Sequence, residues 1–386
     1  MTAVMIPILV FAPFVAAFVS FFAGKKSTRF RDFFVPAFTL LELAVFAVLF
    51  FGAVSSPVTF TLNSVMSLGL NFKVDGFRYI YSLLAIFMWS MCSMASKRYF
   101  LHHENVNRYY FFWLVTLGAT LGVFLSDDLV TAFLFFEIMS FASFVFVAQE
   151  ETEGALRAAV TYLAIAVIGG LCALMGIFML YDYTGSVFME EIAEYCKGNM
   201  TTSTYVAGAL ILVGFGAKAG VFPLHIWLPK AHPVAPAPAS AVLSGMLTKA
   251  GIYGVIFVCC RLYAGSHTAA MIILVLALLT MVTGAVLALF SVDLKRTLAC
   301  SSVSQIGFIL TGIAMFMFEP ENSLALGGTF LHMINHSLFK LILFLCAGVV
   351  MQNLHKLNLN EIRGFGRRKP FLMLPFLTGA IGLAGV

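Results

Sequence analysis

Apolar segments of about 20 residues, separated by short polar stretches, take up most of the chain. A helix needs about 20 apolar residues to cross a bilayer. The pattern therefore predicts eleven membrane-spanning helices and a twelfth that begins at Pro370. The predicted helices cover residues 4–23, 32–53, 76–96, 109–125, 128–148, 158–182, 204–222, 240–262, 268–290, 299–318 and 325–351. Residues 54–75 contain proline and serine, and we expect irregular structure on the outer face there.

One interruption of this pattern differs from the others, because residues 214–249 break what is otherwise helical sequence. It contains prolines at positions 223, 229, 233, 236 and 238. Proline lacks a backbone donor and clashes with the preceding helical turn. We therefore expect the helix to kink or stop at Pro223, no regular helix across the prolines, and a new helix after Ser240. Lys218 precedes this break and Lys249 follows it, an arrangement better suited to an ion path than to a membrane anchor.

The composition assigns the chain to the polytopic membrane proteins. Hydrophobic residues make up 61% of it and charged residues 11%, whereas a soluble protein of this length needs more charge to cover its surface. None of the seven cysteines forms a CxxC pair, which excludes the usual iron–sulfur spacings. The first span lacks the basic n-region of a signal peptide. The apolar segment after Pro370 is too short to cross a bilayer, so we expect the front part of a longer protein.

The basic residues predict the orientation of the chain. With the N-terminus outside, sixteen of the 23 lysines and arginines lie in inner loops, Lys295 among them, four lie in outer loops and three lie inside the membrane. This distribution satisfies the positive-inside rule. It predicts a multi-pass protein of the inner (plasma) membrane with its N-terminus outside. The net charge of +5 then reflects topology rather than nucleic-acid binding.

Charged residues within the predicted spans are the first candidates for function, because such residues are rare and usually face a cavity or a partner. Glu137 lies near the middle of the fifth span, and Lys218 and Lys249 lie in the seventh and eighth. Glu137 is the natural partner of Lys218. The alternatives are a protonated Glu137 that bonds a neighbouring helix and a Lys218 that snorkels to the interface. Glu42 in the second span either snorkels or is held neutral.

Two histidines follow the break on its inner side. His225 and His232 titrate near neutral pH, and we expect them to take part in proton uptake. Trp227 lies between them and is of the type that marks a bilayer interface. The alternative for all three residues is simple anchoring at the interface.

The eleventh span carries His332, His336 and Lys340, each four residues from the next. This spacing places the three side chains on one helix face over about 12 Å, which is the geometry of a proton relay. Because two histidines four residues apart can bind one metal ion, a metal site is the competing idea, but no third ligand is evident. Haem ligation usually needs facing histidines on different helices.

A short internal repeat adds to this picture. Residues 216–221 read GAKAGV just before the break at Pro223, and residues 381–386 read IGLAGV. Broken helices at corresponding positions of two halves are typical of transporter pathways. If the twelfth span repeats the seventh, it is expected to break in the same way.

Several segments together resemble a known family: FFEIMS around Glu137, GFGAKAGVFPLH, HIWLPKAHPVAPAPASAVLSG, DLKRTLACSSVSQIGFI and HMINHSLFKLILFL. The chain resembles the antiporter-like proton-channel subunits over residues 70–386. These include the large membrane subunits of respiratory complex I, the Mrp cation/proton antiporters and the membrane-bound energy-converting hydrogenases. The FFEIMS segment favours the hydrogenase-like branch.

The resemblance implies an all-α membrane fold with inverted helical repeats and broken helices. Residues 1–107 would hold the N-terminal helices, 108–262 the first repeat with its break near Pro223, and 263–386 the second, incomplete repeat. The family's central glutamate would fall on Glu137 and its broken-helix lysine on Lys218. Its bridging lysine would fall on Lys249, and the relay of the second half would use His332, His336 and Lys340.

The resemblance also implies the function. The chain would move protons or sodium ions as a non-redox subunit of a redox-driven pump of the NADH:quinone oxidoreductase or hydrogenase type. It would act beside other membrane subunits and hold no cofactor or metal itself. Two alternatives stay open at this point: a haem- or quinone-binding redox subunit, or a subunit of an Mrp-type cation/proton antiporter. The coupled ion and the redox partner are also open.

Overall fold

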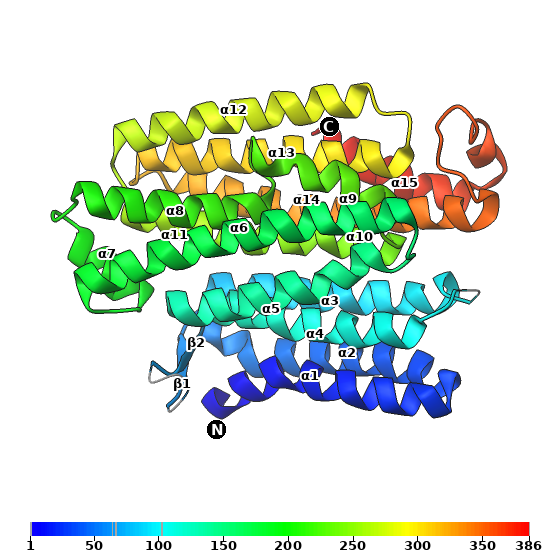
Figure 1. Ribbon diagram of the computed structural model, residues 1–386, viewed down its shortest axis with the longest axis horizontal. Coiled ribbons are helices and arrows are strands. Elements are labelled where there is room, and N and C mark those ends of the chain that lie inside the picture. The colour runs from blue at the N-terminus through cyan, green and yellow to red at the C-terminus, as the bar shows by residue number, and fades with distance from the viewer. Residues whose placement is uncertain (1, 64, 66–67, 102, 386) are drawn as a thin grey trace. The chain divides into compact units, whose positions relative to one another are not determined.

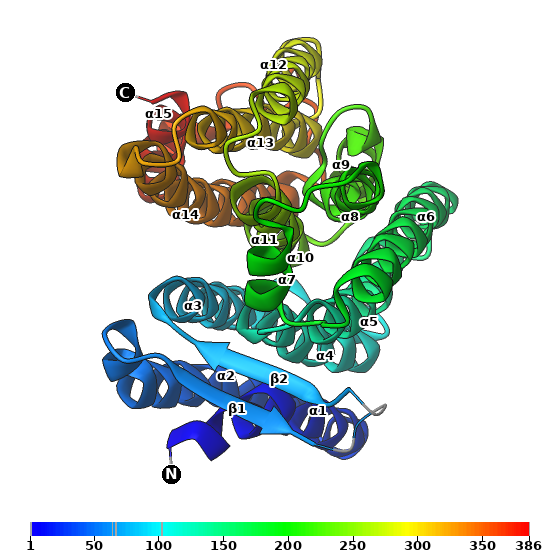
Figure 2. The same cartoon turned by 90° about the vertical axis from the view of Figure 1, so that its left-hand side faces the viewer.

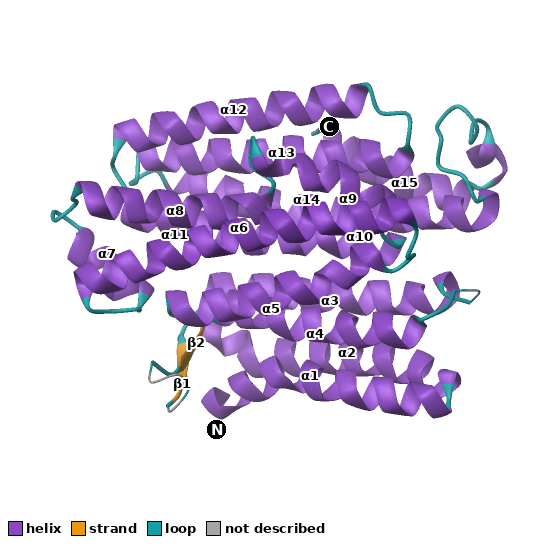
Figure 3. Cartoon of the chain, viewed as in Figure 1, coloured by secondary structure: helices purple, strands orange, loops and turns teal. Residues whose placement is uncertain are grey.

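The computed structural model describes residues 2–385 except residues 64, 66–67 and 102. The chain is almost entirely helical (Figure 3), with one short hairpin. Its contacts divide it into two compact units. The first unit comprises Met1–Gln149 and Leu174–Ala207, and the second comprises Glu150–Ala173 and Gly208–Val386.

The elements follow one another along the chain as Figure 1 labels them. Those that lie wholly in the first unit are α1 (Thr2–Lys26), α2 (Thr28–Phe50), η1 (Phe51–Val54), β1 (Val58–Leu62), β2 (Leu70–Val74), α3 (Gly76–Tyr99), α4 (Val106–Leu125), α5 (Leu129–Ala148) and α7 (Met189–Cys196). Two helices belong partly to each unit, α6 (Glu153–Thr184) and α8 (Thr202–Ala219).

The remaining elements belong to the second unit. They are η2 (Leu224–Trp227), α9 (Leu228–Val234), α10 (Ala237–Val242), η3 (Leu243–Leu247), α11 (Thr248–Phe257), η4 (Val258–Leu262), α12 (His267–Leu289), α13 (Leu294–Phe318), α14 (Ser323–Leu354), η5 (Phe365–Arg368) and α15 (Pro370–Ala384). The segments η3 and η4 are π-helical and continue α10 and α11 without a break.

The predicted spans are confirmed. Eleven helical segments of the described chain are long and apolar enough to cross a membrane, and the shorter apolar helix α15 follows them. The protein is therefore a multi-span, all-α membrane protein. The three predicted segments 1–107, 108–262 and 263–386 describe sequence repeats rather than compact units, and their boundaries stay a prediction.

The prediction of irregular structure for residues 54–75 was wrong. Strands β1 and β2 pair antiparallel there, with Val58 opposite Val74 and Leu62 opposite Leu70. Both strands carry the β-branched and aromatic residues that favour a pleated sheet. Phe72 of β2 also bridges to Ser126, and Figure 2 shows the hairpin lying across the ends of helices of the first unit.

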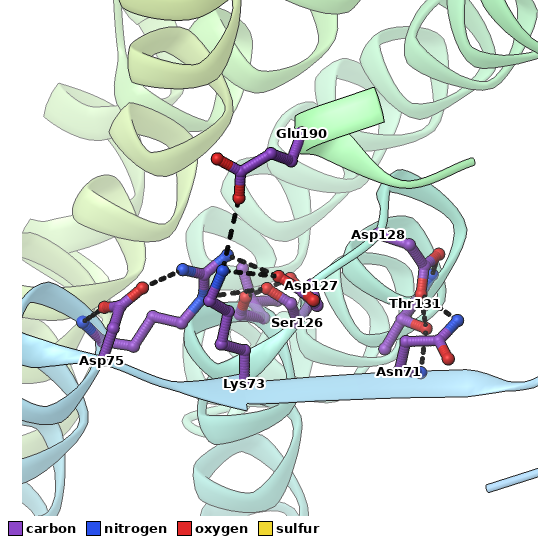
Figure 4. Close-up of polar contacts among 10 residues, drawn as sticks. Asn71, Lys73, Asp75, Ser126, Asp127, Asp128, Thr131 and Glu190 are labelled. Carbon is purple, nitrogen blue, oxygen red and sulfur yellow. Dashed lines mark hydrogen bonds and ion pairs between the residues drawn. The ribbon is translucent and has the colours of Figure 1, made fainter. Parts of the chain in front are cut away.

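Buried hydrogen bonds attach the hairpin to the start of α5 (Figure 4). The Asp128 carboxylate caps α5 by accepting from the Thr131 backbone N–H at 2.7 Å, and it also accepts from the Thr131 hydroxyl. The Asn71 amide of β2 donates to the same carboxylate at 3.0 Å. The Asn71 backbone N–H donates to the Thr131 hydroxyl oxygen at 3.1 Å. These contacts fix the register of the hairpin against α5.

Charged side chains surround this attachment on its exposed side. Arg78 pairs with Asp75, which caps α3, and it also donates to the Ser126 carbonyl at 3.1 Å. Asp127 lies 3.3 Å from Arg78 and 3.8 Å from Lys73. Because these groups are partly exposed, each such pair contributes at most about 1 kcal/mol.

The centre of the second unit is the continuous helix that runs from α10 through η4. Nearly all of its residues are buried, and α9, α13 and α14 pack around it or around one another. Gly251 and Gly254 let it approach α8 closely, since a Cβ at either position would clash with Phe215 or Ala219. By contrast, α12 is mostly exposed along its length. The polar side chains described next lie on this central helix and on α14.

Candidate functional site: a buried lysine and histidine row

The break in the second unit begins where the sequence predicts it. Helix α8 ends at Ala219, and Gly220 follows with a φ of 85°, a left-handed conformation that suits glycine. The last helix ends in the same way, since Gly385 follows Ala384 with a φ of 82°. The two glycines occupy the same position of the predicted repeat, whose last residue, Val386, lies outside the described residues.

The prediction that no regular helix crosses the prolines was wrong. Helix α9 forms over Leu228–Val234 and α10 begins at Ala237, before Ser240. Each of these helices carries a proline in its first turn, where the missing N–H has no intrahelical partner to lose. The chain is extended only at Ala235 and Pro236 between them.

Lys249 is wholly buried on the central helix, directly after the π-helical segment η3. Its amine contacts Nδ1 of His336 on α14. The same amine donates to the Ser244 carbonyl at 3.2 Å and to the Thr248 hydroxyl at 3.4 Å. A π-helical turn changes which side of the helix the next residues face, and this one precedes the lysine that reaches α14.

Helix α14 carries the predicted row, and its members are buried to different degrees. His336 and Lys340 are buried, whereas His332 is half-buried. The Lys340 amine donates to the Leu298 carbonyl at 2.8 Å and to the Ser301 hydroxyl at 2.6 Å. The structure therefore brings Lys249 together with the row that the sequence placed on one face.

A cavity of about 380 Å³ opens beside the two histidines of α14. His332, His336 and Gln305 line it, and one polar atom of each has no hydrogen-bond partner among the described residues, namely both Nε2 atoms and the Gln305 Oε1. A water molecule occupies about 30 Å³ of liquid, so this cavity has room for several. The cavity is also lined by the last described residues, 382–385.

The two histidines of the break are buried rather than exposed at an interface. His232 is wholly buried, its ring lies 5.0 Å from that of Phe344, and neither of its ring nitrogens bonds another described residue. His225 is also buried and its ring stacks on Phe222 at 5.8 Å. His232 thus lies beside α14 at Phe344, four residues after Lys340.

Trp227 is not an interface anchor, which corrects one of the interpretations above. It is 1% exposed, and its ring N–H donates to the Ala217 carbonyl at 2.9 Å. The ring packs edge-on against Tyr162 at 4.9 Å. Trp227 therefore folds the segment after the break back onto the end of α8.

Sequence reasoning placed Lys295 in an inner loop, and the structure shows otherwise. Lys295 is the second residue of α13 and is 3% exposed. Its amine donates to the Ala235 carbonyl at 2.8 Å, at the extended point between α9 and α10. Asp293 caps α13 by accepting a hydrogen bond from the Arg296 backbone N–H. An aspartate in this position is a sequence signal for a helix start, and it could have placed Lys295 in the first turn of a helix.

Lys218, near the end of α8, is 3% exposed and so does not snorkel to an interface. Its amine donates to the Tyr162 hydroxyl and lies 4.6 Å from the centre of that ring. A cavity of about 10 Å³ adjoins Lys218, Tyr162 and Trp227, close to the smallest space that holds one water. Tyr162 is a contact that no sequence pattern indicated.

Two carboxylic acids lie in the first unit. Glu137 is partly buried in the middle of α5, and because Lys218 belongs to the second unit, the pairing of these two residues stays a prediction. Glu42 is 3% exposed in α2, so it does not snorkel. Neither of its carboxyl oxygens has a hydrogen-bond partner within the described ranges.

His332 and His336 are also the side chains to consider for a metal ion. Among the described residues, no group of three or more His, Cys, Asp or Glu side chains is placed to hold one. Lys249 lies beside His336 and adds positive charge, and positive charge opposes the binding of a cation.

Known relatives of this chain include subunits of several membrane complexes. The chain is 32% identical to a Na⁺/H⁺ antiporter subunit of Alkalihalophilus pseudofirmus, over 97% of this chain and 48% of that protein. It is 29% identical to hydrogenase-4 component B of Escherichia coli, over 82% of this chain and 48% of that protein. It is also 29% identical to an NAD(P)H-quinone oxidoreductase chain 4 of Picosynechococcus, over 96% of this chain and 69% of that protein. The chain thus spans about half the length of the first two relatives.

Solved structures share the fold. A chain of the membrane-bound sulfane sulfur reductase, an archaeal respiratory membrane complex, superposes with a TM-score of 0.89 at 27% identity, covering 98% of this chain and 62% of that one. A chain of the Mrp complex from Dietzia sp. superposes with a TM-score of 0.85 at 23% identity, covering 99% of this chain and 71% of that one. The second likeness supports the fold alone.

The family model described as NADH:quinone oxidoreductase/Mrp antiporter, TM, matches residues 126–386. This range includes the break, the central helix and α14. It therefore contains His232, Lys249, His332, His336 and Lys340, which together form the lysine and histidine row. The resemblance found in the sequence is confirmed: the chain belongs to the NADH:quinone oxidoreductase/Mrp antiporter transmembrane family.

Proposed function

We propose that this chain is an ion-translocating membrane subunit of a redox-driven pump, and that it moves protons along its buried lysine and histidine row. The observation that carries the proposal is the contact between Lys249 of α11 and His336 of α14. Two titratable groups on different helices, both wholly or almost wholly buried, can exchange a proton over this contact without either one reaching solvent.

The neighbours of this contact extend it in both directions. On one side, His332 and the cavity of about 380 Å³ give room for water to carry protons. On the other side, Lys340 lies four residues further along α14, and the His232 ring lies 5.0 Å from that of Phe344 on the same helix. His225 and His232 would take up protons from the inner side. Buried charged groups are costly unless they are paired. Each proton that arrives on one of these side chains therefore favours the release of a proton from its neighbour.

The pair predicted between Glu137 and Lys218 would couple this movement to the other subunits. A carboxylate near a buried lysine favours its protonated form, and withdrawal of the carboxylate favours release of the proton. A pair of residues with two such arrangements can favour proton movement along the row in one direction. This step is the part of the proposal that needs the two units to act together.

The proposed setting is the plasma membrane, with the N-terminus outside, as the distribution of lysine and arginine favours. The partners would be other membrane subunits of a larger complex. The chain itself would be its non-redox part, because it presents titratable side chains where a redox subunit would present cofactor ligands. Electrons would pass through those partners.

The second candidate is an Mrp-type cation/proton antiporter subunit. It is favoured by the similarity to two Na⁺/H⁺ antiporter subunits of Alkalihalophilus pseudofirmus, at 32% and 29% identity. A dependence of proton movement on sodium, without any electron donor, would support it. A haem or quinone subunit is the remaining alternative, and a visible absorption band in the purified protein would support that one.

The test is proton translocation by the whole complex in sealed membrane vesicles, with Lys249→Ala and Lys218→Ala compared with wild type. Lys356→Ala is the matched control, because Lys356 pairs with Glu361 at an exposed site. Assembly of each variant is checked on native gels. We expect both buried-lysine variants to assemble and to lose translocation, and the control to keep it. Normal translocation by assembled Lys249→Ala would refute the proposed path.

A further inference from the structure

Tyr162 lies on α6 and is 1% exposed. Its hydroxyl accepts a hydrogen bond from the Lys218 amine, and its ring lies under the same amine at 4.6 Å. Trp227 packs edge-on against the ring and bonds the Ala217 carbonyl next to Lys218. The position of Tyr162 is therefore fixed by the same segment that holds the end of α8.

The chemistry of a phenol suits a lysine that alternates between two proton states. An ammonium only donates hydrogen bonds, whereas a neutral amine can also accept one. A phenolic hydroxyl accepts from the ammonium, and after the proton has left it can turn and donate to the amine lone pair. A backbone carbonyl serves only the donating state. Tyr162 can thus bond Lys218 both before and after proton release.

Other buried lysines of the second unit support this distinction. The Lys340 amine bonds the Ser301 hydroxyl, and the Lys249 amine bonds the Thr248 hydroxyl as well as His336. Each of these partners can both donate and accept. Among the described residues, the Lys295 amine bonds only the Ala235 carbonyl. The lysines placed in the proposed path are therefore the ones that have a partner able to serve both proton states.

We infer that Tyr162 is a positioning residue for ion translocation, and that its hydroxyl holds the Lys218 amine in place in both of its proton states. This inference rests on the proposed function. A small cavity of about 10 Å³ beside the two residues gives space for the single water that would pass the proton on. The Tyr162 hydroxyl keeps its own proton throughout, because it accepts a hydrogen bond from the charged amine and later donates one to the neutral amine.

The experiment compares Tyr162→Phe with wild type in the vesicle assay over a range of pH, with Lys218→Ala measured beside them. Phenylalanine keeps the ring below the amine and removes only the hydroxyl. Tyr79→Phe is the matched control, since the Tyr79 hydroxyl donates to the Ala47 carbonyl at 3.0 Å rather than bonding a lysine. The amount of assembled complex is measured for each variant, and rates are expressed per assembled complex.

We expect Tyr162→Phe to lower the rate at least about tenfold, since a hydrogen bond to a charged group is worth roughly a factor of ten or more. The pH of half-maximal rate should also move, which a defect in packing alone would not cause. Loss of translocation in Lys218→Ala together with a wild-type rate and pH profile in Tyr162→Phe would overturn this inference alone. Undiminished translocation in Lys218→Ala would instead overturn the proposed function.

Discussion

Replacing Asp128 with alanine should release the β1–β2 hairpin from α5. Asp128 is wholly buried, and its carboxylate accepts from the Thr131 backbone, the Thr131 hydroxyl and the Asn71 amide. Loss of an N-cap carboxylate costs about 0.5–2 kcal/mol. The Asn71 amide would then be a buried donor without an acceptor, which costs about 1–3 kcal/mol. The sum is about 1.5–5 kcal/mol against attachment of the hairpin.

Amide hydrogen exchange measures this local opening directly. The peptide that contains Asn71 should exchange at least about ten times faster in Asp128→Ala, because 1.4 kcal/mol corresponds to a factor of ten. The neighbouring Asp127 provides the control. Its carboxylate pairs with Arg78 and Lys73 at a partly exposed site, so Asp127→Ala loses two such pairs and should cost at most about 2 kcal/mol.

Comparing Asp128→Ala with Asp127→Ala shows whether the buried hydrogen bonds of Asp128 hold the hairpin on α5. If both variants exchange at the same rate in the hairpin, buried hydrogen bonds of Asp128 do not hold it, and the reasoning is refuted. If the exchange of α5 rises together with that of the hairpin, the cap matters more than the link to Asn71. Faster exchange of the hairpin alone supports the link.

Two further predictions follow from the same kind of contact. Burial raises the pKa of the Asp128 carboxyl, although the hydrogen bonds from Thr131 and Asn71 act against this shift. The raised pKa means that the protonated carboxyl stabilises the folded protein. This contribution to stability is fully present below the ordinary pKa of aspartate and is lost as pH rises through the raised pKa of the folded state. The melting temperature of wild type minus that of Asp128→Asn should therefore fall as pH rises from the ordinary pKa of aspartate toward neutrality. Ser301→Ala removes the hydroxyl that bonds the Lys340 amine at 2.6 Å, and it should lower translocation about tenfold.

Each of these has its own check. A melting difference that stays constant or rises with pH would contradict the direction of the pKa shift at Asp128. For the serine, the control is Ser302→Ala, because the Ser302 hydroxyl bonds Ser244 and the Leu298 carbonyl rather than a lysine. Equal translocation by the two serine variants would show that the hydroxyl beside Lys340 has no part in the path.

The spans, the end of α8 before Pro223 and the common face of His332, His336 and Lys340 were predictable, because each follows from local periodicity. A segment of about 20 apolar residues must cross the bilayer, and proline must end or bend a helix. A spacing of four residues places side chains on one helix face. The family resemblance also depended on residues close together in the sequence, such as the GAKAGV segment around Lys218.

Neighbouring residues explain two of the local interpretations that failed. The alternation in β1 was too short to separate a strand from a loop, and its pairing with β2 depends on the link from Asn71 to Asp128. Trp227 is of the type found at interfaces, but the carbonyl of Ala217 and the ring of Tyr162 bury it.

The sequence by itself determined that Glu137, Lys218, Lys249 and the row on α14 lie within long apolar helical segments, since hydropathy and spacing are properties of the chain. Only the tertiary structure decided which of them meet. The contact of Lys249 with His336, the burial of Lys295 against Ala235 and the hydroxyl of Tyr162 under Lys218 each join different helices. Such contacts depend on helix packing and on the π-helical turn before Lys249, and neither of these leaves a periodic signal in the sequence.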